Sequence, residues 1–143
     1  MTFTSSLASF SVIRTLNDSG NGPRLFAIHR QGTSAMAGGG AEDPGVAVTG
    51  ARNVDWEDMA ADNDGHLIIG DIGNNASRRK DLCLYVVEEP DPARDRSVAV
   101  RRRIGFRYPD GNDSAFGRTS FDAEALFWAE GSAYILTKQH MGR

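Results

Sequence analysis

The sequence predicts an all-β protein, and three observations carry that prediction. Short apolar stretches of strand length recur along the chain, between clusters of Gly, Asn, Asp and Ser. Apolar residues do not recur at the spacing of an amphipathic helix. The turn clusters, such as Asp62–Gly65, supply residues that tolerate positive φ or cap their own backbone, as tight reversals between antiparallel strands require.

The apolar stretches give the predicted strands in order. The stretch around Cys83 (LCLYVV) is apolar throughout, which is typical of a buried strand. Between Val98 and Tyr108 the apolar residues share one face and leave arginines on the other, which is typical of a strand with a solvated side. The predicted strands are Ser11–Leu16, Arg24–His29, Gly45–Thr49, Val54–Ala60, His66–Gly70, Asp81–Glu88, Val98–Tyr108, Phe121–Trp128 and Ala133–Thr137.

Composition excludes several classes of protein. At 143 residues the chain has room for one domain with a real core. Its net charge of −3 argues against a nucleic-acid or anionic-membrane partner, because both require a positive surface. The single cysteine, Cys83, allows neither an internal disulfide nor a Cys/His zinc site. Met1–Ser11 lacks the pattern of a secretory signal, which predicts a cytoplasmic protein as written and leaves export of a longer parent open.

A repeat links two parts of the chain. Residues 54–75 align without a gap on residues 121–142, at an offset of 67. Within this alignment Asp55 falls on Asp122, Glu57 on Glu124, the trio Leu67–Ile69 on Tyr134–Leu136, and Asp71 on Lys138. A fainter third copy matches Asn17–Asn21 with Gly70–Asn74 at Asp, Gly and Asn. Each repeat is thus an acid-bearing strand, a short apolar strand, a turn and two further strands.

Four-stranded units repeated in this way describe the blades of a β-propeller. The predicted fold is therefore an incomplete β-propeller of about two and a half antiparallel blades, forming a single partial domain over residues 1–143. Residues 1–50 are predicted to form a degenerate first blade, residues 51–118 the second blade, and residues 119–143 the first half of a third. We interpret the chain as a truncated propeller, which would present open blade edges and associate with itself through them.

Seven short motifs in order resemble the signatures of an uncharacterised bacterial β-propeller family. They are LNDSG at 16–20, DWEDMA at 55–60, GDIGNN at 70–75, VEEP at 87–90, YPDG at 108–111, DAEAL at 122–126 and TK at 137–138. At superfamily level this family is similar to the propellers of lactonases, calcium-dependent phosphotriesterases and phytases. The resemblance implies a propeller fold, and in intact relatives a divalent cation in the central channel with hydrolase-like activity.

The repeated acids are the candidate metal ligands. In a propeller the first strand of each blade lines the channel, so Glu57 and Glu124 would converge there. Strand alternation places Asp55 on the face of Glu57 and Asp122 on the face of Glu124, whereas Asp58 points away. Carboxylates with nearby amide oxygens suit calcium. The alternative is that these acids accept backbone N–H bonds and tie strands together.

Two further acids, Asp18 and Asp71, lie in equivalent turns. There a side chain can cap backbone amides, and the following Gly20 or Gly73 can adopt positive φ. Because Lys138 takes the corresponding place in the third copy, a position facing the channel stays possible, and both acids join the candidate metal ligands. No catalytic residue is assigned, since the familiar nucleophile and zinc-hydrolase motifs are absent.

Two functions follow as hypotheses. One is a calcium-assisted hydrolase of lactones, esters or phosphoesters, in which the cation polarises the ester or activates water. The other is a non-catalytic propeller that acts as a scaffold or binding module, in which case this chain is a fragment without activity. The partner is a small molecule or a protein in either case.

Overall fold

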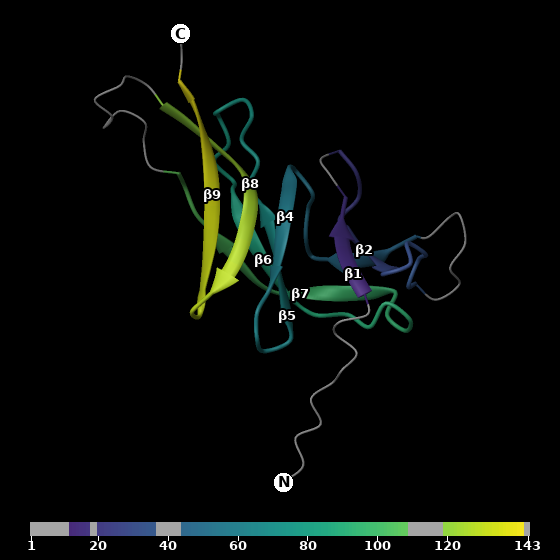
Figure 1. Cartoon of the computed structure of the whole chain (residues 1–143). Coiled ribbons are helices and arrows are strands. Elements are labelled where there is room, and N and C mark those ends of the chain that lie inside the picture. The colour runs from purple at the N-terminus through teal and green to yellow at the C-terminus, as the bar shows by residue number, and fades with distance from the viewer. Residues whose placement is uncertain (1–11, 18–19, 37–43, 109–118, 142–143) are drawn as a thin grey trace.

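The computed structural model describes residues 12–17, 20–36, 44–108 and 119–141. Within these ranges every regular element is a β-strand, which confirms the predicted all-β class (Figure 1). Since the same ranges hold no helix, none there has the length and apolarity needed to span a membrane.

The described residues form nine strands, and each overlaps one of the predicted stretches. The largest difference is at the C-terminal end, where the last strand continues four residues beyond the predicted Thr137, to Met141. The strands are β1 (Val12–Leu16), β2 (Arg24–His29), β3 (Val46–Thr49), β4 (Trp56–Ala61), β5 (His66–Asp71), β6 (Cys83–Glu88), β7 (Ser97–Gly105), β8 (Thr119–Ala129) and β9 (Ser132–Met141).

Seven of the described strands form one curved sheet in the order β1-β2-β3-β7-β6-β5-β4. Strands β4 to β7 pair antiparallel with their neighbours in sequence, as do β1 to β3. The link between the two groups is parallel and pairs β3 with the first residues of β7, Ala47 with Ser97 and Thr49 with Ala99. The prediction of separate, wholly antiparallel blades is wrong at this link. Strand β7 is long enough to pair with β6 at one end and with β3 at the other.

The sheet β4–β7 is covered on both faces. One face packs against β1–β3, and the other packs against the β8–β9 hairpin, which forms a separate two-stranded sheet (Figure 1). Strand alternation divides the side chains of β5, because Leu67 and Ile69 enter the first core and Ile68 enters the second. The buried residues of the first core are Leu25, Ala27, Ala35, Met36, Val46, Val48, Trp56, Leu67, Ile69, Cys83, Tyr85 and Val87. Those of the second core are Ala60, Ile68, Ile72, Leu84, Ala123 and Leu126.

Candidate functional site

The loop Ile72–Asn74 lies between the start of β4 and the start of β8. On the β4 side, Gly73 N donates to Asp55 O over 3.1 Å. On the β8 side, Asn74 N donates to Asp122 Oδ1 over 2.6 Å, and Asn74 Nδ2 donates to the carbonyl of Phe121 over 2.9 Å. The loop therefore joins the two acid-bearing strands of the repeat.

Gly73 packs directly against two of the predicted metal ligands. A Cβ added at this position would overlap Asp55 Oδ2 and Glu57 Oε1, so the two carboxylates lie side by side at the glycine. We predicted that Gly20 and Gly73 use positive φ, and this is confirmed for Gly20, at 80°. It is wrong for Gly73, where the absence of a side chain instead makes room for the acids.

Asp71 is fully buried and bound from two directions. Asp55 N donates to its Oδ1 over 2.9 Å, and Arg79 Nη1 lies 2.8 Å from the same oxygen. The Arg79 guanidinium also donates to Asp81 Oδ1 and to the carbonyl of Gly73. Burial alone would lower the pKa of Arg79, but its hydrogen bonds to Asp71 and Asp81 raise that pKa above the ordinary value. Asp71 and Arg79 thus form a salt bridge in which the carboxylate is fully buried.

Asp122 is the buried acid of the second hairpin, with no exposed surface. Its Oδ1 takes the Asn74 N–H, and its Oδ2 lies 3.5 Å from Lys138 Nζ. Lys138 also bonds Glu124, and this bond raises the pKa of the lysine. Both Lys138 and Glu124 are well exposed, with side chains 41% and 55% accessible.

The structure places Glu57 and Glu124 at the same local feature. Strand β4 carries a bulge between Trp56 and Asp58, and β8 carries one between Ala123 and Ala125, so each glutamate is the extra residue of its bulge. Beyond the bulges the gapless alignment is wrong by one residue. Gly70 pairs with Asp58, whereas Leu136, and not Thr137, pairs with Ala125. The second hairpin has a connection one residue shorter, so Thr137 takes the place of Asp71, and the trio Leu67–Ile69 corresponds to Ala133–Ile135.

Three further side chains, to which the sequence analysis gave no role, form bonds at this site. Asp58 turns away from Glu57, as alternation predicts, and its Oδ2 accepts the N–H of Leu126 on β8 over 2.7 Å. Tyr108 Oη donates to the carbonyl of Ile72 over 2.8 Å, and burial raises the pKa of this tyrosine. Arg79 sits in the basic run Arg78–Lys80, where no sequence signal selects one cation over its neighbours.

The predicted ligands therefore divide into two groups. Asp55, Glu57 and Asp71 gather at the ends of β4 and β5, and Asp122 and Glu124 gather with Lys138 on the β8–β9 hairpin. Asp18 lies outside the described residues. In the parts of the chain that the structure describes, no group of three or more such side chains is arranged to hold a metal ion.

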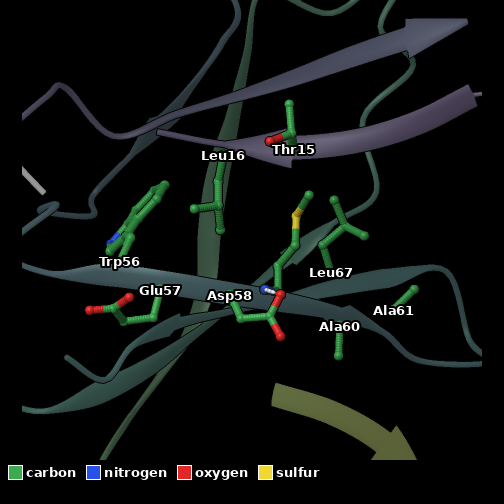
Figure 2. A pocket seen from close by; sticks show the side chains of 9 residues that line it. Thr15, Leu16, Trp56, Glu57, Asp58, Ala60, Ala61 and Leu67 are labelled. Carbon is green, nitrogen blue, oxygen red and sulfur yellow. Dashed lines mark hydrogen bonds between the residues drawn. The ribbon is translucent and has the colours of Figure 1, made fainter. Parts of the chain in front are cut away.

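A cleft of about 490 Å³ opens between β1 and β4, next to the first group (Figure 2). Leu16 points from β1 toward β4, and Trp56 and Leu67 supply further apolar wall. The ionisable residues among its lining are Glu57 and Asp58, and the Asp58 carboxylate is directed to β8. The cleft thus combines apolar side chains with a lining surface that is more polar than apolar, and the Glu57 carboxylate belongs to that lining.

Comparison of the chain with protein-family models, with curated proteins and with solved structures finds no match.

Proposed function

We propose that this protein is a non-catalytic binding or scaffold module of the β-propeller type, in which the repeated acids hold neighbouring β-units together. One observation carries the proposal: buried and partly buried acids are bonded across the boundaries between strands and sheets. Asp58 and Asp122 accept backbone N–H groups on the far side of the second core, and Asp71 is paired with Arg79.

These bonds account for the burial of Asp71 without a ligand. A buried carboxylate is costly unless hydrogen bonds or a cation compensate it. Asp71 has both kinds of partner, whereas Asp122 has a backbone N–H on Oδ1 and a buried Oδ2 that lacks a hydrogen-bond partner among the described residues, 3.5 Å from the exposed Lys138 Nζ. Polar groups that bridge packed sheets fix the orientation of one sheet on the next, which is what a scaffold requires.

Two features support the propeller arrangement. The sheet β4–β7 is an antiparallel meander of four strands, the make-up of one blade. Each of its faces is covered by another β-unit, as a blade is covered by its neighbours in a ring. The ordered motifs that resemble the propeller family agree with this arrangement.

The proposal is tested by thermal unfolding, read by Trp56 and Trp128 fluorescence, in millimolar calcium and in chelator. We expect the same midpoint in both, and no turnover of an aryl ester, a lactone or a phosphate ester with calcium present. A site saturated at 100 times its Kd would stabilise the fold by about 2.7 kcal/mol, a shift on the order of several degrees. Such a shift, or metal-dependent turnover, would contradict the proposal.

A second candidate is a divalent-cation site at Asp55 and Glu57, and the side-by-side carboxylates at Gly73 favour it. Oxygen donors of this kind fit calcium or magnesium, and Glu57 also reaches the β1/β4 cleft. A cation held there would polarise an ester bound in the cleft, which is the hydrolase hypothesis. The neighbouring Arg79, which bonds the Gly73 carbonyl, opposes a second positive charge at this place.

Asp55→Asn separates the two candidates. If a cation binds, this substitution abolishes the calcium-dependent shift, while the matched control Asp64→Asn, an exposed turn residue, preserves it. If the acids are structural, calcium moves the midpoint of neither variant.

A further inference from the structure

Strand β9 offers an open edge. In the ranges that the structure describes, β9 pairs with β8 and with no other strand. The corresponding strand of the first hairpin, β5, has both edges filled, because β6 pairs with it from His66 to Asp71. Strand β9 is ten residues long, and alternate residues along its free edge present backbone N–H and C=O groups of the kind that a further strand binds.

This edge lacks the usual protection. Native edge strands are guarded by proline, by bulges or by charged side chains, lysine above all. Strand β9 contains no proline, and the bulge of its hairpin lies on β8. Its lysine, Lys138, is bonded to Glu124 on the neighbouring strand.

The outer face of the β8–β9 hairpin is apolar as well. Phe127, Tyr134 and Leu136 are 45%, 43% and 51% exposed, and the rings of Phe127 and Tyr134 stack with centroids 4.9 Å apart. The corresponding residues of the β4–β5 hairpin are Ala60, Ile68 and Gly70 by the register of the two bulges, and all three are buried. The edge and the face that are covered in the first hairpin are therefore both uncovered in the second.

We propose that two copies of this chain pair through β9, antiparallel and about a two-fold axis. The result is a four-stranded sheet in the order β8-β9-β9-β8, the same number of strands as β4–β7. An antiparallel edge needs a strand of opposite direction, and a two-fold axis supplies one from β9 itself. The proposal concerns the edge alone and holds whichever function the acids serve.

Charge and side-chain pairing favour a second copy as the occupant. With the axis at Ile135, Tyr134 lies opposite Leu136 of the second copy, which joins an aromatic to an aliphatic side chain. Ser132 then lies opposite Lys138 of the second copy, and Ala133 opposite Thr137, so no like charges face each other. The exposed sides of Tyr134 and Leu136 become covered by one another.

The test is sedimentation velocity of the full chain across a dilution series. We expect a reversible monomer–dimer equilibrium, with slower hydrogen exchange of the β9 amides at high concentration than at low. Leu136→Lys places a charge in the seam at an exposed position, so it raises the dimer dissociation constant by about tenfold or more, equivalent to about 1.4 kcal/mol, without changing the melting temperature of the monomer.

Phe127→Ser is the matched control. It removes an exposed apolar side chain from the same face, on β8, which takes no part in the backbone pairing of the seam, and it leaves the dimer intact. Equal loss of the dimer in both variants would mean that the faces stack, and would overturn edge pairing. A monomer at every concentration, or growth into larger assemblies, would overturn it too.

Discussion

The β4–β5 and β8–β9 hairpins begin alike and end differently. Both open with an acid-bearing strand that bulges at a glutamate, Glu57 or Glu124. In the first, the buried Asp71 is paired with the partly buried Arg79. In the second, the cation is the exposed Lys138. The first hairpin is also covered on both faces, whereas the second is covered on one.

The difference shows how a one-residue change in the length of a connection changes which side chains pair across the hairpin. The segment from Asp58 to its partner Gly70 is one residue longer than the segment from Ala125 to its partner Leu136. In the shorter hairpin the turn residues Glu130 and Gly131 both have positive φ. A shift of one residue changes which side chains share a face, because alternation has a period of two. Lys138 therefore pairs with Asp122, while the aligned Asp71 pairs with Trp56.

The largest expected effect on stability distinguishes Arg79 of the first hairpin from Lys138 of the second. Arg79→Met leaves the buried Asp71 carboxylate without its cationic partner and the Gly73 carbonyl without the Arg79 donor. We therefore expect a loss of about 3–5 kcal/mol in the free energy of unfolding, measured in urea. Lys138→Met removes an exposed partner, and its urea midpoint should be close to that of the wild type. A similar loss in both variants would mean that the two hairpins depend equally on their cations.

Gly73→Ala tests the packing that is specific to the first hairpin. The new methyl group meets Asp55 and Glu57, which should cost about 1–3 kcal/mol of stability. Asp55→Ala in the same chain should recover part of that loss, and a double-mutant cycle in urea measures the coupling. Gly22→Ala is the control, since nothing lies near its added Cβ and its stability should stay within about 0.5 kcal/mol of the wild type.

Asp58→Ala removes the carboxylate that joins β4 to β8. The buried N–H of Leu126 loses its acceptor, and we expect a loss of about 1–3 kcal/mol, measured by urea unfolding. The corresponding residue of the second hairpin is Ala125. Ala125→Asp should change stability by no more than about 0.5 kcal/mol, because no neighbouring strand in the described residues presents an N–H to it. A stabilising Ala125→Asp would indicate that the outer face is covered.

The smallest effect concerns Tyr108 at the junction of the two hairpins. Its pKa is raised in the folded state, so its contribution is complete below about pH 10 and is lost as the pH rises through the folded-state pKa. The stability difference between the wild type and Tyr108→Phe should therefore narrow in alkaline solution. Urea unfolding at neutral and alkaline pH measures it, and a constant difference would exclude ionisation of Tyr108 as its cause.

The sequence by itself determined the all-β class and the approximate position of every described strand, because apolar stretches and turn residues act locally. It also named six acids as candidate metal ligands, and two of them, Asp71 and Asp122, are fully buried. It could not show that Gly73 is small to admit two carboxylates, since that contact joins separate strands.

Only the tertiary structure decided the partners of the acids and the register of the second hairpin. The tertiary structure brings Arg79 to Asp71, Asn74 to Asp122 and Leu126 to Asp58. Local sequence patterns do not predict these contacts. The parallel pairing of β3 with β7 likewise joins segments far apart in sequence. Local propensity determines which residues form strands, whereas the packing of one sheet on another determines which charged side chains come into contact.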